Sequence, residues 1–245
     1  MSAPDVGSEV IAGRPVRAVI FDRDGVLVRF DLEFLRAFFE PLLPIPLSAL
    51  SNHWRTWCAQ RRGPQTLDEE RAFWSGFWDM VFGVVELDDD VRRRLRAFDY
   101  ATALIPFSDA EPALRLAHSM GLRVGVLSNF PLSSLEQSLE HVGLARFIHA
   151  FCASAAIGAS KPDPASYMAV CRALEVEPAE CVFFDDEAPC VAGARAVGMN
   201  AFLIDRKRPD HALSEGVLRG LDALEAVLDR RSSELEMVFA GPPRA

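Results

Sequence analysis

Short apolar runs that stop abruptly at polar residues are the feature that most constrains how this chain folds. Such runs predict buried strands. They lie at residues 16–21 (VRAVIF), 122–127 (LRVGVL), 181–184 (CVFF) and 201–204 (AFLI), with a weaker candidate at 147–152 (FIHAFC). Helical patterns separate the runs, and strands that alternate with helices are typical of a parallel sheet covered on both faces. We therefore expect an α/β fold with a Rossmann-like parallel sheet core and helices on both faces.

The helices between the strands carry start and stop signals in the sequence. They are predicted over 109–120, 133–142, 164–174 and 188–197. In the second of these, Ser133 is followed three positions later by Glu136, which predicts a capping box at the start of the helix. Gly143 marks its end, because glycine tolerates the left-handed conformation that stops a helix.

Residues 31–104 interrupt the alternation of strands and helices. They hold no convincing strand and carry Phe and Trp at helical spacing, which is typical of the packed interior of a helical module. The predicted helices lie at about 31–40, 47–61, 66–83 and 88–101. We predict an all-helical cap domain at 31–104, an α/β core domain made of 16–30 and 105–230, and flexible tails at 1–15 and 231–245.

Charge and cysteine content exclude several classes of function. Lys and Arg total 26 against 35 acidic residues, and the resulting net charge of -9 repels nucleic acids and anionic membranes. No apolar run is long enough to span a bilayer. The five cysteines are scattered without a C-x-x-C pair, which favours a reduced, cytoplasmic compartment. We expect no nucleic-acid or membrane partner, and a monomer or a homodimer.

Polar residues follow three of the predicted strands at the points where the strands end. They are Asp22, Asp24, Ser128, Asn129, Asp185 and Asp186. Ligands of parallel α/β sheets bind at the carboxyl ends of the strands, so these side chains should converge although the sequence separates them widely. Clustered carboxylates repel one another, and a hard divalent cation such as Mg²⁺ resolves that repulsion.

At this point the chain resembles the haloacid dehalogenase-like hydrolases. The four motifs of that superfamily occur in order, and the resemblance runs from about residue 16 to residue 205. They stand as FDRDGVLV (21–28), LSN (127–129), the lysine of SKPDP (160–164) and VFFDDEAPCVAGARAVGM (182–199). A lone D-x-D is a weak signal, whereas four ordered motifs at predicted strand ends or loops are a strong one.

The resemblance implies a phosphatase that acts on a small phosphate ester and depends on Mg²⁺. In this reading Asp22 is the nucleophile that carries an aspartyl-phosphate, and Asp24 is the general acid and then the general base. Ser128 and Asn129 hold phosphoryl oxygens. Lys161 neutralises charge shared by the nucleophile and the phosphoryl group.

The resemblance also implies the metal ligands and a role for the inserted helices. Asp186 binds Mg²⁺ together with Asp22 and the backbone carbonyl of Asp24, and Asp185 is a further candidate ligand. The insertion is a mobile cap that closes over the site and excludes water and large substrates. In its loop, Arg61 and Arg62 are tentative specificity residues, although they equally suit the solvated end of a helix.

The chain departs from the commonest family pattern in its fourth motif. Asp185 stands where Gly is frequent, and Cys190 stands where a second acidic residue is frequent. A cysteine does not replace a carboxylate, so the surroundings of the metal should differ from the commonest pattern. We expect Arg23, between the two aspartates of the first motif, to point away from the metal and to have no role.

Simpler explanations exist for each of these residues taken alone. Asp22 and Asp24 suit a turn before a glycine, and Lys161 suits an exposed surface. Among functions, a phosphomutase acting on a sugar phosphate uses the same four motifs. A haloacid dehalogenase uses the same nucleophile, but lacks the acid at the position of Asp24. A non-catalytic binding module is disfavoured because the motif set is complete.

Overall fold

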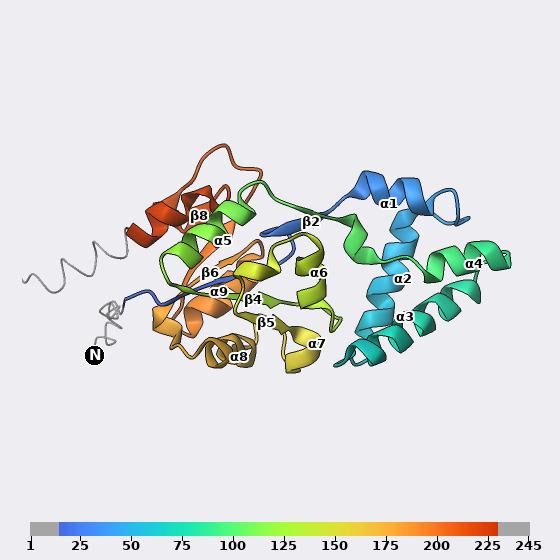
Figure 1. The fold of residues 1–245 in the computed structure, drawn as a ribbon, viewed down its shortest axis with the longest axis horizontal. Helices are drawn as coiled ribbons and strands as arrows, with labels where there is room; N and C mark the ends of the chain where they lie inside the picture. Colours follow the sequence, from blue (N-terminus) through green and yellow to red (C-terminus); the bar gives the residue numbers. More distant parts are fainter. Residues whose placement is uncertain (1–14, 230–245) are drawn as a thin grey trace, which may run out of the picture.

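The computed structural model describes residues 15–229 and has at its centre a six-stranded sheet in which all pairings are parallel (Figure 1). The strand order is β5-β4-β1-β6-β7-β8. The strands are β1 (Ala18–Phe21), β4 (Arg123–Ser128), β5 (Ala150–Ala153), β6 (Cys181–Asp185), β7 (Asn200–Ile204) and β8 (Val217–Leu218). The predicted α/β fold is confirmed. The two-residue edge strand β8 was not predicted, because so short a segment leaves no periodic signal in the sequence.

Alternation along β1 shows why a sheet covered on both faces forms. Val19 and Phe21 pack into one hydrophobic cluster with α5 and α6, while Ala18 and Ile20 pack into a second cluster with α8 and α9. All four side chains are fully buried. Strands that are buried on both faces have continuously apolar sequences, and this explains the apolar runs from which the strands were predicted. The helices are α5 (Ala110–Ser119), α6 (Leu135–His141), α7 (Ser154–Ile157), α8 (Pro164–Leu174) and α9 (Ala188–Ala196).

Four helices inserted after the first strand lie together on one side of the molecule (Figure 1). They are α1 (Leu32–Phe39), α2 (Leu47–Ala59), α3 (Leu67–Phe82) and α4 (Asp89–Arg96). These four helices form the helical insertion, and they enclose a hydrophobic cluster of their own, in which Phe39, Phe77 and Trp78 are buried. The division into a core domain and a cap domain is consistent with separate clusters and stays a prediction. The predicted tails lie almost entirely outside the described residues.

The boundaries of the helical insertion differ from the sequence prediction in two places. The fourth helix ends at Arg96 rather than at residue 101, and a 3-10 turn at Tyr100–Ala103 follows. The side chain of Asp99 accepts a hydrogen bond from the Ala101 N–H, which starts this new turn. The insertion is joined to the sheet by an antiparallel ribbon of β2 (Val28–Phe30) and β3 (Leu104–Pro106), which the sequence did not reveal.

A buried glutamate of the helical insertion takes the place of the predicted capping box at α6. Glu70 of α3 accepts hydrogen bonds from the backbone N–H groups of Ser133 and Ser134, both at 2.8 Å, and from both serine hydroxyls. Helix α6 begins at Leu135, and the predicted Ser133–Glu136 box is therefore wrong. A carboxylate from a segment remote in sequence satisfies the same exposed N–H groups, which a local pattern does not reveal.

The described part of the chain has neither a helix that could span a membrane nor a disulfide bond. None of the helices between residues 15 and 229 is both long enough and apolar enough to cross a membrane. All five cysteines lie in this range and are free, and the closest approach of sulfur atoms is 3.9 Å, between Cys171 and Cys181.

Glu70 provides a test of how the helical insertion is held against the sheet. Replacing Glu70 with Ala removes a charged acceptor and leaves two backbone N–H groups without it, so the free energy of unfolding should fall by about 2–4 kcal/mol. Urea unfolding measures the change. The control is Glu69→Ala, because Glu69 is exposed and accepts from the Gln65 N–H within the insertion. Equal losses in the two variants would contradict a holding role for Glu70.

Candidate active site

The carboxyl edge of the three central strands brings together residues from all four motifs. Asp22 follows β1, Ser128 ends β4 and Asp185 ends β6, and these strands are neighbours in the sheet. The backbone N–H of Asp22 donates to the Phe184 carbonyl at 2.8 Å, which extends the β1–β6 pairing to the site. The widely separated motifs therefore meet because of the strand order, as the sequence predicted.

A buried ion triad lies at the centre of this edge. Lys161 Nζ donates to Asp22 Oδ1 at 2.6 Å and to Asp185 Oδ2 at 2.7 Å. All three residues are buried, with Lys161 5% exposed. Burial lowers the pKa of Lys161, but the two carboxylates outweigh it and the net pKa is raised. The ammonium group therefore stays charged and neutralises part of the carboxylate cluster.

Asn129 holds this lysine in place through its backbone. Its amide Nδ2 donates to the Lys161 carbonyl at 2.9 Å, and its Oδ1 accepts from the Lys161 N–H at 2.7 Å. In this structure the polar atoms of the Asn129 side chain thus point to the loop that carries Lys161. Its predicted contact with phosphoryl oxygens stays a prediction. Ser128, the adjacent candidate, is buried at the end of β4.

The first-motif loop is tightly folded against the fourth motif. Gly25 has a φ of 76°, and a Cβ atom built there would lie 2.0 Å from a carboxylate oxygen of Asp186. A side chain at this position is excluded by both the backbone conformation and the space. The glycine therefore permits the loop that carries Asp22 and Asp24 to lie directly against Asp186.

Arg23 has a role that the sequence did not predict. Its side chain is buried, and its guanidinium forms a fork on the Asp24 carboxylate, with Nη2 2.8 Å and Nε 3.2 Å from Oδ2. Nη1 donates to Ser138 Oγ at 3.1 Å, and the guanidinium lies 3.9 Å from the centre of the Phe130 ring. The expectation of an arginine without a role is wrong, because the buried guanidinium bonds to both Asp24 and Ser138.

A second arginine supports the backbone of the same loop. Arg206, which follows β7, donates to the backbone carbonyls of Gly25 and Val26 and forms an ion pair with Asp109. It also stacks 3.6 Å from the centre of the Phe107 ring. These contacts fix the backbone on which Asp24 is carried. Arg206 lies just after β7 and outside the four motifs, so no sequence signal pointed to it.

The acidic cluster fits a hard divalent cation. One carboxylate oxygen from each of Asp22, Asp185 and Asp186 lies within 4.8 Å of the others. Burial, together with the charge of Asp185, raises the pKa of Asp22 to about 7 and that of Asp186 to about 6. Carboxyl groups whose ionised forms are disfavoured in this way are those that a bound cation stabilises.

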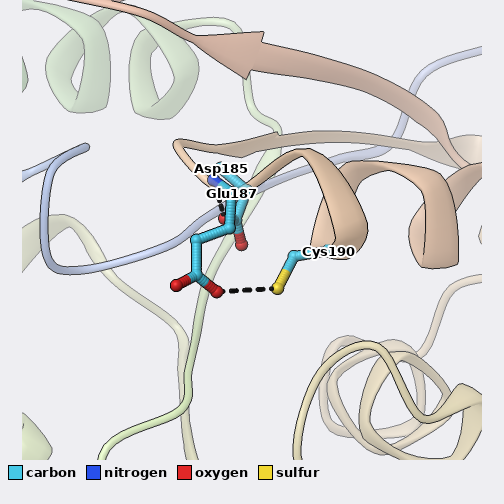
Figure 2. A group of neighbouring side chains, drawn as sticks. All are labelled: Asp185, Glu187 and Cys190. Atoms are coloured by element: carbon cyan, nitrogen blue, oxygen red, sulfur yellow. Dashed lines mark hydrogen bonds between the residues drawn. The ribbon is translucent and has the colours of Figure 1, made fainter.

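Cys190, which stands where the family pattern has an acidic residue, lies beside the carboxylate of Glu187. Figure 2 shows Asp185, Glu187 and Cys190 together at the start of α9, and the Cys190 thiol donates to Glu187 Oε2 at 3.2 Å. The Glu187 N–H donates to Asp185 Oδ1 at 2.8 Å. Both oxygens of Asp185 are therefore engaged, one by this N–H and the other by Lys161.

The two tentative specificity arginines lie away from the cleft that borders Asp24. Arg61 is exposed, and its guanidinium stacks 3.3 Å from the centre of the Trp57 ring. Arg62 is exposed and lines a separate cavity of about 240 Å³ next to Gly63. The cleft beside Asp24 has a volume of about 360 Å³, and neither arginine lines it. Their role in binding substrate stays a prediction.

Comparison with known proteins places the chain in one family of hydrolases. The family model of the haloacid dehalogenase-like hydrolases matches residues 16–198. The chain is 37% identical over 215 residues to the protein named phosphatase MT3486 of Mycobacterium tuberculosis (strain CDC 1551 / Oshkosh), and the match covers 87% of this chain and 97% of the relative. It is 26% identical to (S)-2-haloacid dehalogenase 1 of Pseudomonas sp. (strain CBS-3), over 78% of this chain and 86% of the relative.

Solved structures share the fold. A phosphatase of this family from Thermococcus onnurineus superposes with a TM-score of 0.61 and 24% identity, covering 87% of this chain and 98% of the other. At this identity the likeness shows the fold alone. It supports the arrangement of a parallel sheet with a helical insertion after the first strand.

The raised pKa values of the acidic cluster predict how cation binding depends on pH. Asp22, with a pKa of about 7, and Asp186, with a pKa of about 6, must lose protons before they bind a cation. The affinity for Mg²⁺ should therefore increase as pH rises from 5.5 to 8, and binding near pH 6 should release protons. Calorimetry in two buffers of different ionisation enthalpy measures both. An affinity that stays constant over this range would contradict the assignment.

Proposed function

The chain belongs to the haloacid dehalogenase-like hydrolases, and we propose that it is a Mg²⁺-dependent phosphatase that hydrolyses a small phosphate monoester through an aspartyl-phosphate on Asp22. The observation that carries the proposal is the placement of Asp24. Its carboxylate lies two residues beyond the buried nucleophile, its side chain is 45% exposed, and it lines the cleft. Hydrolysis of a phosphate monoester needs a proton donor next to the leaving oxygen, and Asp24 is placed to be that donor. A cytoplasmic location and a monomer or homodimer remain part of the proposal.

The residues of the site account for both halves of the reaction. A carboxylate oxygen of Asp22 attacks phosphorus, the bond from phosphorus to the ester oxygen breaks, and that oxygen takes the proton of Asp24. In the second half Asp24 accepts a proton from water, the water oxygen attacks phosphorus, and the bond to Asp22 breaks to release phosphate. Lys161, 2.6 Å from Asp22, offsets charge on the nucleophile and the phosphoryl group.

Asp22 and Asp186, with the backbone carbonyl of Asp24, would hold the metal. Asp185 is better suited to fixing Lys161, because both of its oxygens already accept hydrogen bonds. Bound Mg²⁺ supplies charge neutralisation and orientation of the phosphoryl oxygens. Ser128 and Asn129 lie at the neighbouring strand end, and we propose that Ser128 contacts a phosphoryl oxygen while Asn129 acts mainly by fixing Lys161.

Two other reactions use the same nucleophile and remain distinguishable. A haloacid dehalogenase would release halide without a metal and needs no acid at the position of Asp24. A phosphomutase would transfer the phosphoryl group back to a sugar phosphate, which requires a cleft that binds hydroxyl groups. The named phosphatase relative at 37% identity supports hydrolysis of a phosphate ester.

The role of Asp24 predicts an effect that depends on the leaving group. Asp24→Asn keeps the shape of the side chain but removes the proton, so turnover of an alkyl phosphate should fall by about 10²–10⁴-fold. Formation of the phosphorylated enzyme from acetyl phosphate, whose leaving group needs no proton, should fall much less. Asp22→Asn should abolish both reactions. Rapid-quench kinetics separates the steps.

Full steady-state activity of Asp24→Asn on an alkyl phosphate would exclude the acid–base role of Asp24. Metal-independent halide release from 2-haloacids by the unaltered protein would exclude the phosphatase proposal.

The fork between Arg23 and Asp24 predicts a positioning effect. Arg23→Gln should reduce phosphoryl transfer from an alkyl phosphate by about 10- to 100-fold, because Asp24 is no longer held at the leaving oxygen. Transfer from acetyl phosphate should change little, which a general loss of structure would not produce. Ser138→Ala is the control, since it removes a hydrogen bond of Arg23 and keeps the fork. Equal losses with both substrates would show a structural role only.

A further inference from the structure

The cleft beside Asp24 is lined mainly by apolar side chains from two parts of the chain. The helical insertion contributes Trp54 and Trp74, and the loop after β4 contributes Phe130. The Trp54 and Trp74 rings are stacked with 4.3 Å between their centres, and Tyr100 stacks on Trp74 at 6.1 Å. These aromatic rings form one wall of contacting side chains, and they line the same cleft as Asp24, the carboxylate expected to protonate the leaving oxygen.

The charged groups and the tyrosine hydroxyl of this wall already have partners. Arg23 and Asp24, the two charged side chains of the wall, bond to each other. The Tyr100 hydroxyl lies 2.7 Å from the Ser134 hydroxyl. The Ser51 hydroxyl and the indole N–H groups of the tryptophans are the other polar side-chain groups of the wall. A ligand in this cleft therefore meets chiefly apolar surface and few hydrogen-bonding groups.

The chemistry of the site places the organic part of the substrate in this cleft. The phosphoryl group must contact Asp22, which is buried, and the ester oxygen must reach Asp24, which borders the cleft. The carbon atoms bonded to that oxygen then lie beyond Asp24, among the aromatic rings. The apolar wall therefore contacts the leaving alcohol rather than the phosphate.

We propose that the substrate is the phosphate monoester of an apolar alcohol that carries an aromatic ring or an alkyl group of similar volume. This inference rests on the proposed phosphatase function. The hydroxyl groups of a sugar phosphate would lose water here and gain few partners, which is unfavourable. A dry apolar cavity of about 150 Å³ holds one benzene molecule. The cleft of about 360 Å³ therefore accommodates one ring and a short linker.

Three substrates with primary alcohol leaving groups test the proposal, because their demand for a proton is similar. They are 2-phenylethyl phosphate, ethyl phosphate and glucose 6-phosphate. Full burial of a ring the size of the Phe side chain contributes about 10- to 160-fold. For the unaltered protein with Mg²⁺, kcat/KM for 2-phenylethyl phosphate should therefore exceed that for ethyl phosphate on the order of 100-fold. Glucose 6-phosphate should react no better than ethyl phosphate.

A matched pair of variants on α1 separates the cleft from the rest of the insertion. Leu32 is 54% exposed and lines the cleft, whereas Phe34 is 40% exposed and does not line it. Leu32→Asp should raise KM for 2-phenylethyl phosphate several-fold more than it raises KM for ethyl phosphate. Phe34→Asp should change neither. Equal effects of the two variants on 2-phenylethyl phosphate would overturn the assignment of the cleft.

The outcomes distinguish failure of this inference from failure of the proposed function. Glucose 6-phosphate reacting as well as 2-phenylethyl phosphate would overturn the inference and leave the phosphatase intact. If neither these esters nor acetyl phosphate were hydrolysed, the proposed function would fail. Binding of 2-phenylethylphosphonate then tests the cleft through tryptophan fluorescence, because three of the four tryptophans, Trp54, Trp74 and Trp78, line it. Binding no tighter than that of methylphosphonate would overturn the inference in that case as well.

Discussion

A lysine ammonium group buried between two carboxylates is the interaction on which the rest of the site depends. Lys161 contacts Asp22 and Asp185 at 2.6 and 2.7 Å, and all three groups are shielded from water. A buried charge is tolerated only when it is paired, so removal of Lys161 would leave both carboxylates without their counter-charge. The parallel order β4-β1-β6 satisfies this requirement because it brings two strand ends and the lysine loop together. Asn129 completes the arrangement by binding the lysine backbone.

The helical insertion adds a second requirement, which is a defined position relative to the sheet. Glu70 supplies it by accepting hydrogen bonds from the start of α6. Helix α6 also carries Ser138, which bonds to Arg23, and Arg23 in turn holds Asp24. The contact between insertion and sheet is thus connected through α6 to the proposed acid. Residues 130–132, which directly precede this contact, line the apolar cleft. The segment that anchors the insertion is therefore connected both to the proton donor and to the surroundings of the leaving group.

The sequence predicted the parts of the molecule that depend on local patterns. Apolar runs identified the main strands because both faces of the sheet are covered, and the residues after Phe21, Leu127 and Phe184 marked the edge where the site lies. It did not predict contacts between distant segments. Glu70 replaced the expected capping box, and Arg23 and Arg206 proved to hold the first-motif loop. The short strands β2, β3 and β8 were also missed, because two or three residues carry no periodicity.

The central claim is that Asp22 itself accepts the phosphoryl group. Peptide mass spectrometry of acid-quenched Asp24→Asn protein, after incubation with acetyl phosphate and Mg²⁺, locates that group directly. The account predicts one phosphoryl group on the peptide that contains Asp22, and none when a chelator replaces Mg²⁺. Phosphate release with an unmodified Asp22 peptide, or a phosphoryl group on another residue, would contradict it.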